Sequence, residues 1–357
     1  MNLRIAQAIL ICYDDYVVYT SWCIQKVSPT GRTNPMHQTQ IHRSRHFYWL
    51  FVIVVTVINL PEISMKLHNF LAVSTLTLAA VIPLAAQAQQ TIKVGSKNFT
   101  EQFVLAEIYA QALEAAGIKT EKKLNLGGTL IAHKALEEKQ IDFYPEYTGT
   151  MLLAVLKQEP MTEPKAVYDK VKEAYAKMGF SVLNQSNLNN GYVMVLRPET
   201  AQKYKLETLS DLSKVAKELK IGAGPEFRDR KDGLPGLKAK YDMVFGEDLQ
   251  MAIGLRYQAL KGDQIQVVNG YSTDGMISAL KLKRLRDDKN LWPPYYVVPV
   301  VRKEVLDANP KVAEVLNRVS ALLDEPTMAV MNFQVDGEKM EPKDVARDFL
   351  KAKGLVK

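Results

Sequence analysis

Short apolar runs of strand length alternate, after residue 90, with segments in which apolar residues recur every three or four positions. The first pattern is typical of strands and the second of amphipathic helices. The strands predicted in this way lie at 91–95, 120–126, 141–144, 180–183, 192–196, 220–223 and 264–268. The predicted helices lie at 101–116, 129–140, 150–157, 166–178, 209–212, 236–241, 248–260, 274–280, 303–308, 310–324 and 341–352. This alternation over short spacings predicts an α/β fold with a parallel or mixed sheet.

Two segments interrupt the alternation and predict connections between two lobes. A polar cluster at 184–191 leads into the second lobe, and the apolar run 292–301 leads back. Two lobes joined by two crossovers form a hinged cleft, which is a common binding site for small molecules. The lobes assigned in this way are residues 89–191 with 299–357, and residues 192–298.

The stretch 141–150 predicts a turn in which a strand meets a helix. Proline has no N–H for a strand ladder, so Pro145 is expected to end the strand that begins at Ile141. Tyr147 and Thr150 would then lie at a helix N-terminus, which is where ligands bind in open α/β sheets. The alternative is a purely structural turn, with Tyr147 packed on its neighbours.

Three further side chains have local roles in this interpretation. Thr100 is expected to be the N-cap of the helix that follows the first strand, with Phe99 packing before it. Asp274 is expected to cap the helix that it precedes. His133 is expected on the exposed face of the helix that follows Gly128.

The first 88 residues differ from the rest of the chain. Residues 1–64 sustain no period, whereas residues 65–88 have the positive start, apolar stretch and Ala86-Gln87-Ala88 cleavage site of a secretory signal peptide. We therefore interpret Met65 as the start and residues 1–64 as a spurious or disordered extension. The alternative is a membrane-anchored N-terminus that uses residues 47–60, although a run of 14 falls short of the roughly 20 residues that span a bilayer.

Composition narrows the chemistry of residues 89–357. Both cysteines and four of the five histidines precede this part, which therefore holds a single histidine, His133. That excludes thiol chemistry and a Cys/His metal cluster there, so we expect no metal and no cofactor. The net charge of +7 is mild, and Lys and Arg are not interleaved with aromatic residues, so no nucleic-acid partner is expected.

Four tyrosines lie in loops or crossovers that a two-lobed fold would direct at its cleft. They are Tyr147, Tyr192, Tyr271 and Tyr295. A quaternary ammonium cannot donate hydrogen bonds, so it is bound by ring faces, at about 0.5–2 kcal/mol per contact. The four tyrosines predict a cage for such a cation, although tyrosines are also common at strand ends and interfaces for structural reasons.

Basic and hydroxyl side chains in the same loops are candidates for holding a carboxylate. Lys97 follows the first strand, Arg230 lies in a charged loop, and Thr150 lies at a helix N-terminus. Arginine binds carboxylates with a planar two-pronged fork. The alternatives are that Lys97 is a solvated turn residue, and that Arg230 is a surface charge or yields its role to Arg228.

Eight short motifs follow one another along the chain. They are VGSKNFTEQ at 94–102, LGGT at 126–129, DFYPEYTGT at 142–150, NGY at 190–192, RKDGLPGL at 230–237, YSTDG at 271–275, DDK at 287–289 and PPY at 293–295. Together they resemble, in motif and in order, the osmoprotectant substrate-binding proteins of ABC importers, which bind glycine betaine, choline or carnitine. The resemblance covers about residues 91–355.

The resemblance implies a two-lobed periplasmic binding protein of type II-like topology, in the α/β class. The implied cage tyrosines are Tyr147, Tyr192, Tyr271 and Tyr295. The residues implied to hold a carboxylate are Lys97, Thr150 and Arg230. Gly191 departs from the pattern, because the family's motif has threonine before the tyrosine, and Tyr296 beside Tyr295 leaves that assignment open by one position.

We predict a periplasmic solute-binding subunit, monomeric and not an enzyme, that delivers its ligand to an ABC permease in the inner membrane. Glycine betaine is favoured over choline, because a bare cation would meet two uncompensated positive charges, those of Lys97 and Arg230. Choline, carnitine, an amino acid or another small carboxylate remain alternative ligands. A secreted enzyme that pairs Glu146 with Asp142 for acid–base work is a further alternative.

Overall fold

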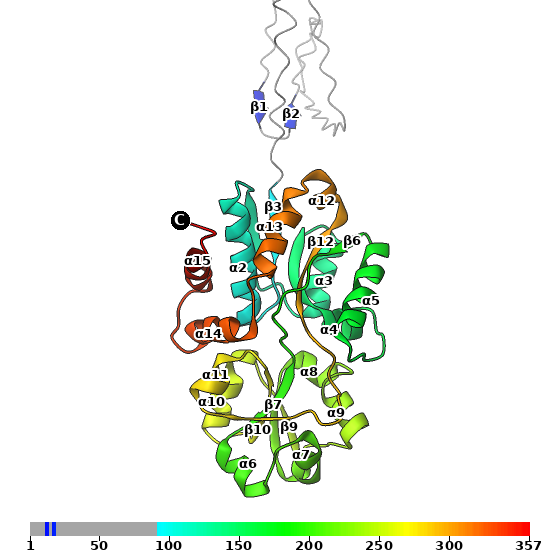
Figure 1. Cartoon of the computed structure of the whole chain (residues 1–357), viewed down its shortest axis with the longest axis vertical. Helices are drawn as coiled ribbons and strands as arrows, with labels where there is room; N and C mark the ends of the chain where they lie inside the picture. The colour runs from blue at the N-terminus through cyan, green and yellow to red at the C-terminus, as the bar shows by residue number, and fades with distance from the viewer. Residues whose placement is uncertain (1–10, 14–15, 19–90) are drawn as a thin grey trace, which may run out of the picture. The chain divides into compact units, whose positions relative to one another are not determined.

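The computed structural model describes residues 11–13, 16–18 and 91–357 (Figure 1). β1 (Ile11–Tyr13) and β2 (Tyr16–Val18) pair with each other as a short antiparallel ladder. The signal peptide predicted at 65–88, and most of the extension predicted at 1–64, lie outside the described residues. No helix in the described part of the chain is long and apolar enough to cross a membrane.

The first of two five-stranded sheets lies in the upper lobe of Figure 1, with strand order β4-β3-β5-β12-β6. β3 is parallel to β4 and β5, whereas β12 is antiparallel to β5 and β6. The strands are β3 (Ile92–Gly95), β4 (Thr120–Lys123), β5 (Phe143–Tyr147), β6 (Phe180–Val182) and β12 (Val297–Arg302). The helices are α2 (Thr100–Ala115), α3 (Thr129–Glu137), α4 (Thr148–Thr150), the π-helical η1 (Met151–Val155), α5 (Pro164–Lys177), α12 (Lys303–Ala308), α13 (Lys311–Ser320), α14 (Glu325–Asp336) and α15 (Pro342–Ala352).

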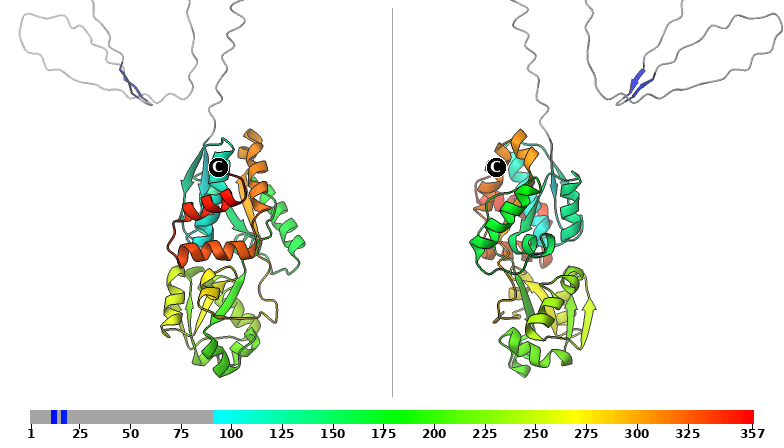
Figure 2. Two further views of the ribbon diagram at one scale, coloured as in Figure 1. Left: turned by 60° about the vertical axis from the view of Figure 1, so that its left-hand side comes forward. Right: turned by 90° about the vertical axis from the view of Figure 1, so that its right-hand side faces the viewer.

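Strand β12 shows why this sheet has helices on both faces (Figure 2). All of its residues are buried, and successive side chains point to opposite faces. Val297 and Val301 join a core with residues of α2, α13 and α15, whereas Val298 and Val300 join a core with residues of α3 and α5. A strand that is buried on both faces is a continuous apolar run in the sequence, which is how this one could be recognised.

The second sheet has strand order β11-β7-β10-β8-β9, with β10 antiparallel to β7 and parallel to β8. The strands are β7 (Tyr192–Leu196), β8 (Lys220–Ala223), β9 (Glu247–Gln250), β10 (Val267–Tyr271) and β11 (Lys283–Leu285). The helices around it are α6 (Pro198–Tyr204), α7 (Leu209–Val215), η2 (Ala216–Glu218), α8 (Pro225–Asp229), α9 (Leu234–Tyr241), η3 (Ile253–Leu255), α10 (Arg256–Lys261) and α11 (Gly275–Ala279).

The chain passes from the first sheet to the second after β6 and returns before β12, so there are two crossovers. These crossovers are bonded to each other: the Asn190 N–H donates to the Tyr295 carbonyl at 3.0 Å, and the Val297 N–H donates to the Leu188 carbonyl at 3.0 Å. α14 packs on both α2 and α11. The predicted two-lobed α/β fold is confirmed. The lobe boundaries that we propose remain residues 89–191 with 299–357, and 192–298.

Pro145 does not end its strand, contrary to the prediction. β5 continues through it to Tyr147, and Pro145 lies opposite Pro299 of β12. The Pro299 carbonyl accepts the Leu183 N–H at 3.0 Å, so the polar edge of Pro299 faces β6 rather than β5. The two prolines therefore form a non-hydrogen-bonded pair and remove no hydrogen bond between β5 and β12.

Two of the predicted helices are wrong in extent or type. The segment predicted as a helix at 248–260 contains β9 and, later, α10; β9 is an edge strand with mostly exposed side chains, so no apolar run marks it. The helix predicted at 310–324 ends at Ser320, and Asp324 caps a separate helix, α14, by accepting the Thr327 N–H. The helices α6, α8 and α14 and the strands β11 and β12 were not predicted, since the run that contains β12 was assigned to a crossover.

His133 is buried, contrary to the prediction, and its ring packs edge-on against that of Tyr175, with 5.5 Å between centroids. Burial lowers the pKa of His133, which favours the neutral ring.

Thr100 is the first residue of α2 rather than its N-cap, which is Phe99. The Thr100 hydroxyl instead donates to Asp336 at 2.6 Å, so it ties α2 to α14.

Candidate functional site

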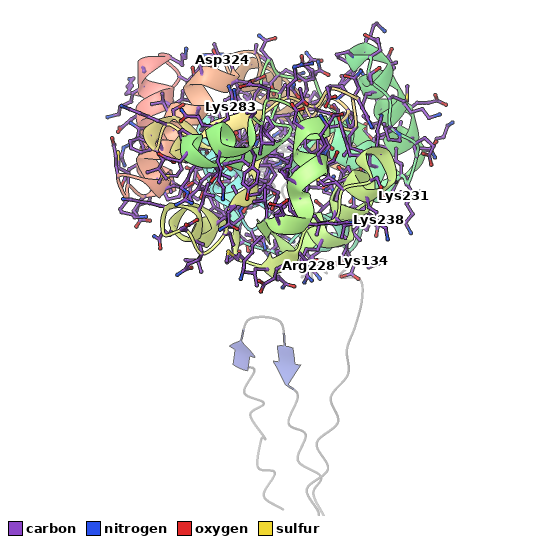
Figure 3. The ribbon with its side chains drawn as sticks, turned by 90° about the horizontal axis from the view of Figure 1, so that it is seen from below. Lys134, Arg228, Lys231, Lys238, Lys283 and Asp324 are labelled. Carbon is purple, nitrogen blue, oxygen red and sulfur yellow. The ribbon has the colours of Figure 1, made fainter. Side chains whose placement is uncertain are left out.

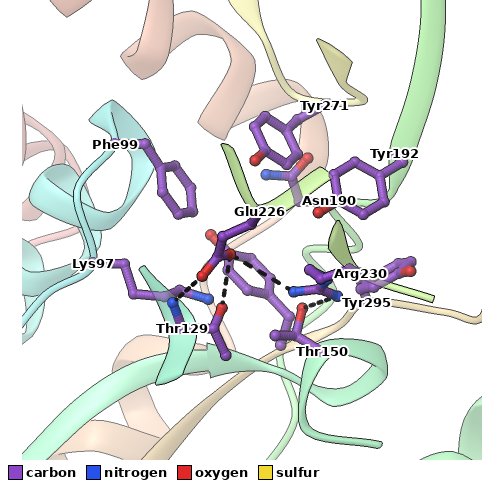
Figure 4. A pocket seen from close by; sticks show the side chains of 11 residues that line it. Lys97, Phe99, Thr129, Thr150, Asn190, Tyr192, Glu226, Arg230, Tyr271 and Tyr295 are labelled. Carbon is purple, nitrogen blue, oxygen red and sulfur yellow. Dashed lines mark hydrogen bonds and ion pairs between the residues drawn. The ribbon is translucent and has the colours of Figure 1, made fainter. Parts of the chain in front are cut away.

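A pocket is lined by residues from both lobes and from both crossovers (Figure 4). The seven residues predicted as a site all line it: Lys97, Tyr147, Thr150, Tyr192, Arg230, Tyr271 and Tyr295. Four lining residues were not predicted as part of a site: Phe99, Thr129, Asn190 and Glu226. Tyr147 is the N-cap of α4, so the predicted position where a strand leads into a helix is confirmed.

Five aromatic rings form a continuous series along the pocket. Phe99 stacks on Tyr147 and on Tyr271, with centroid distances of 6.3 and 5.5 Å. Tyr192 stacks on Tyr271 at 5.4 Å and meets Tyr295 edge-on at 5.8 Å. Burial raises the pKa of all four tyrosines, to about 12 in the case of Tyr271, so the rings stay neutral. Neutral ring faces of this kind can bind a quaternary ammonium.

Phe99 is the aromatic residue that sequence reasoning missed. It was assigned only to packing at the start of a helix, yet its ring lies between Tyr147 and Tyr271. Its position was a usable signal, because Phe99 lies in the turn after β3, and a turn of that kind directs side chains at the cleft of an α/β lobe.

Tyr295, rather than Tyr296, is the tyrosine that lines the pocket. Its hydroxyl donates to Asp232 at 2.5 Å, and its backbone N–H donates to the Asn189 side chain at 2.7 Å. Gly191 lies beside it, because a Cβ at that position would be 3.4 Å from Cδ2 of the Tyr295 ring. Glycine at position 191 therefore leaves this ring unobstructed by a neighbouring side chain.

Lys97 forms a buried ion pair. Its ammonium is 2.5 Å from the Glu146 carboxylate, and the two side chains are 3% and 0% exposed. The same ammonium lies 4.5 Å from the centroid of the Tyr147 ring. Lys97 therefore lies at the predicted pocket, but its charge is already compensated by the protein.

Arg230 is also paired. Its guanidinium donates to both oxygens of Asp232, at 2.8 and 2.6 Å, and a longer contact of 3.5 Å reaches the Thr150 hydroxyl. Arg228 points elsewhere: it donates to Asp248 at 2.7 Å, and Figure 3 shows it at the periphery of the view. The structure thus brings Arg230, and not Arg228, into the pocket lining.

The two positive charges of the pocket are therefore not uncompensated, contrary to the prediction. Lys97 has Glu146, and Arg230 has Asp232. A charge held inside a protein needs such a partner, because the desolvation cost of an unpaired ion is high. The electrostatic reason given for preferring glycine betaine to choline is wrong, because it counted the cations without their partners.

Glu226 of α8 reaches across to the other lobe. Its carboxylate accepts the backbone N–H of Thr129 and, at 3.2 Å, the Thr129 hydroxyl. Thr129 is the first residue of α3, so the carboxylate lies at the N-terminus of that helix, where unpaired N–H groups favour an anion. The Arg230 guanidinium is 3.9 Å from the same carboxylate. Sequence reasoning missed this contact because it joins residues far apart in the chain.

Glu101 of α2 is the acceptor of a buried network beside the pocket. It accepts the hydroxyls of Tyr147 and Thr273 and the side-chain amides of Asn190 and Asn332. These four donors come from the end of β5, the loop after β10, a crossover and α14. Burial raises the pKa of Glu101, and the four hydrogen bonds oppose that shift only in part. The network fixes the hydroxyl end of Tyr147 while its ring lines the pocket.

Asp274 supports the loop that carries Tyr271, and this differs from the predicted cap. It stands at the N-cap position of α11 but makes no side-chain cap bond. Its carboxylate instead accepts the Tyr271 backbone N–H at 2.9 Å and the Tyr257 hydroxyl at 2.5 Å. Burial raises the pKa of Asp274. Its contacts therefore hold Tyr271 in place from behind.

The carboxylates considered for acid–base work are engaged in other contacts. Asp142 accepts the Lys93 backbone N–H at 2.8 Å and lies 3.7 Å from Arg302, whereas Glu146 is paired with Lys97. Among the described residues, no group of three or more His, Cys, Asp or Glu side chains is placed to hold a metal ion.

A family model described as the substrate binding domain of an ABC-type glycine betaine transport system matches residues 90–352. The chain belongs to this family. A solved structure of a glycine betaine/carnitine/choline ABC transporter aligns with a TM-score of 0.63 at 33% identity, covering 74% of this chain and 99% of the other. A structure of a choline binding protein in complex with choline, at 17% identity and a TM-score of 0.58, supports the fold alone.

Among relatives, a carnitine transport binding protein of Listeria monocytogenes is 34% identical over 271 residues, covering 75% of this chain and 88% of the relative. A glycine-betaine-binding protein of Pseudomonas aeruginosa is 35% identical over 282 residues, covering 76% and 90%. An ergothioneine transport permease and binding protein of Helicobacter pylori is 34% identical over 297 residues, covering 81% of this chain and 53% of the relative.

Family membership settles the class of protein. The chain is the substrate-binding protein of an ABC importer for quaternary ammonium compounds, and it acts outside the cytoplasm. It is a binding protein and not an enzyme, so the alternative of a secreted enzyme is wrong. The fold is that of a two-lobed periplasmic binding protein.

Proposed function

We propose that the ligand of this chain is glycine betaine, captured in the pocket by closure of the two lobes. The observation that carries the proposal is the juxtaposition of an aromatic series with hydrogen-bond donors that already donate to a carboxylate. Phe99 and Tyr271 of the aromatic series line the same pocket as the donors Thr129 and Arg230. A trimethylammonium and a carboxylate are the two ends of glycine betaine.

The trimethylammonium would lie against ring faces that come from both lobes. Phe99 and Tyr147 belong to elements of the first sheet, Tyr192 and Tyr271 to the second, and Tyr295 to the returning crossover. Closure of the lobes therefore completes the cage and removes water from the cation at the same time. Removal of water strengthens the attraction between a cation and ring faces to about 2 kcal/mol or more per contact.

The carboxylate would lie on the opposite side of the pocket. We propose Lys97, Thr150 and Arg230 as its contacts, with the Thr129 N–H and hydroxyl added from the structure. Thr150 already accepts a hydrogen bond from Arg230, so both face the same space. The empty space of the pocket, open solvent included, is about 340 Å³.

The wider role follows from the same proposal. The binding protein would reach the periplasm by means of the signal peptide at 65–88, act there as a monomer, and deliver glycine betaine to an ABC permease in the inner membrane. Choline is the second candidate ligand. The observation that favours it is the pairing of Lys97 with Glu146 and of Arg230 with Asp232, which leaves no excess positive charge against a cation.

Calorimetric titration of the purified protein with glycine betaine, choline and glycine tests the proposal. We expect glycine betaine to bind and glycine, which lacks the methyl groups, to give no response. Arg230→Ala should weaken glycine betaine binding by about tenfold or more, since a charge-assisted contact is worth about 1.5–3 kcal/mol, and should affect choline less. Arg228→Ala is the matched control and should change neither.

Two results would contradict the proposal. No response to glycine betaine would remove it as the ligand. Equal losses of glycine betaine and choline binding in Arg230→Ala would mean that Arg230 shapes the pocket and does not contact a carboxylate.

A further inference from the structure

The hydrogen-bond donors that we propose for the ligand's carboxylate are already bound to a side chain of the protein itself. Glu226 accepts the Thr129 N–H and hydroxyl at the start of α3, as Figure 4 shows by dashed lines. Gly128 makes this approach possible, because a Cβ there would overlap Oε1 of Glu226. The backbone at Gly128 is extended, with φ of −76°, so glycine is needed there for space and not for an unusual conformation.

Glu226 is a carboxylate for which the described pocket lining holds no cation of its own. Lys97 and Arg230 each have a carboxylate of their own, Glu146 and Asp232. Glu226 is thus the third carboxylate beside two cations, and its distance to Arg230 is the longer one, 3.9 Å against 2.6 Å for Asp232. A second carboxylate placed on the Thr129 donors would meet this negative charge directly, and like charges that close repel strongly.

Exposure distinguishes Glu226 from its neighbours. Its side chain is 41% exposed, whereas those of Arg230 and Asp232 are 11% and 1% exposed. Glu226 can therefore exchange the Thr129 donors for water at little cost, because an exposed ionic contact contributes only about 0–1 kcal/mol. The buried pair of Arg230 and Asp232 has no such alternative.

We propose that Glu226 is an intramolecular competitor for the carboxylate of the ligand, and that it sets the preference of the pocket between zwitterionic and cationic quaternary ammonium compounds. A carboxylate-bearing ligand gains the Thr129 donors only when Glu226 leaves them. A purely cationic ligand leaves Glu226 in place and gains a negative charge nearby. The inference rests on the proposed function, because it takes the Thr129 donors as part of the ligand pocket.

Titration of Glu226→Gln and Glu226→Ala with glycine betaine and choline tests the inference. Glutamine keeps the shape and loses the charge, and alanine vacates the position. We expect glycine betaine affinity to rise from wild type to Gln to Ala, by about tenfold overall, and choline affinity to fall severalfold. Asp229→Asn is the matched control: it removes an exposed carboxylate from the same helix and should shift neither affinity by more than about twofold.

Gly128→Ala provides a second, independent test. Its Cβ would take the space of the carboxylate oxygen, so the Glu226 carboxylate, or a ligand carboxylate in its place, would have to move away from the Thr129 N–H. We expect this variant to weaken glycine betaine binding by about tenfold, with a smaller effect on choline. Glu226→Ala and Gly128→Ala both displace the Glu226 carboxylate, yet their effects on glycine betaine must have opposite signs.

The outcomes separate the inference from the function on which it rests. Glycine betaine binding that is unchanged or weaker in both Glu226 variants would overturn the inference and leave the proposed function intact. Glycine betaine binding by none of the proteins would overturn the proposed function, and the inference with it. Opposite shifts for the two ligands in the Glu226 variants would support both.

Discussion

Two carboxylates connect the lobes, and they differ in almost every physical respect. Glu101 extends from the first lobe, is 2% exposed, and accepts four donors that include Asn190 of a crossover and Thr273 of the second lobe. Glu226 extends from the second lobe, has a side chain that is 41% exposed, and accepts the two donors of Thr129. Both lie beside the same ligand pocket.

The comparison shows that a contact between lobes can have either of two roles. A buried acceptor with several donors cannot be replaced by water, so its loss leaves all of the donors unsatisfied. Glu101 therefore fixes the positions of Tyr147 and Asn190, which line the pocket. A half-exposed acceptor can be replaced by water or by a ligand at little cost. Glu226 is thus the exchangeable member of the two.

The largest expected effect is that of Glu101→Ala. It removes the acceptor of four buried hydrogen bonds, although the Asn332 amide keeps its bond to the Thr273 carbonyl. Each unsatisfied buried group costs about 1–3 kcal/mol, so we expect the free energy of unfolding to fall by about 3 kcal/mol or more. Urea denaturation measures this. Glu114→Ala, an exposed position on the same helix, is the control and should stay within about 0.5 kcal/mol. A loss as small as that of the control would remove the distinction between the two carboxylates.

Tyr147→Phe isolates one bond of the buried network. The ring remains in the pocket and only the hydroxyl that donates to Glu101 is lost. We expect a loss of about 1–2 kcal/mol in the free energy of unfolding. Tyr271→Phe is the matched control, since the described residues offer its hydroxyl no hydrogen-bond partner, and it should be nearly neutral. Equal effects of the two changes would mean that Glu101 does not depend on this donor.

A smaller effect is expected on the pH dependence of stability. Burial raises the pKa of Glu101 above its ordinary 4.5, so the folded protein holds a proton there up to a higher pH than the unfolded chain does. The stability contributed by this site is complete below pH 4.5 and is lost as the pH rises through the raised pKa. Denaturation of wild type and Glu101→Gln from about pH 4 to about pH 8 should show wild type losing stability relative to the variant. A relative gain with rising pH would reverse the sign and contradict the prediction.

The smallest expected effect is that of Glu226→Ala on stability, in contrast to its expected effect on ligand preference. Because the side chain is half-exposed, we expect the free energy of unfolding to change by no more than about 0.5 kcal/mol. The same denaturation series measures it. A loss of about 2 kcal/mol or more would show that Glu226 is a structural contact like Glu101.

The sequence was sufficient to predict which residues line the pocket, but not which side chains pair with them there. Tyr147 and Tyr271 are the last residues of their strands, and Lys97 lies just after β3. Strand ends on one edge of a sheet converge, so the placement of these residues could be predicted. The pairing of Lys97 with Glu146, 49 positions away, depends on the register of β3 and β5 and could not. Asp232 lies only two positions after Arg230, so the sequence did offer a candidate partner for that arginine, which the prediction did not consider.

The misassigned elements have a common physical cause. β9 is an edge strand with exposed side chains, so no apolar run marks it, whereas β12 lies in an apolar run that was assigned to a crossover and not to a strand. Pro145 was expected to end β5 because a proline has no N–H to donate. The sequence does not show that Pro299 of β12 lies opposite Pro145, at a position where neither residue needs an N–H to bond β5 to β12. His133 is enclosed by an aromatic contact with Tyr175, from a different helix.

The bonding between the two crossovers bears on the mechanics of capture. The Ser186 N–H donates to the Val297 carbonyl, and the Asn190 N–H donates to the Tyr295 carbonyl, each at 3.0 Å, so the connections form a narrow ribbon. Two independent tethers would allow the lobes to swivel as well as to close. Two connections that are bonded to each other must bend together. The lobe closure proposed for ligand capture would therefore act on both crossovers at once and could not proceed by the movement of one connection alone.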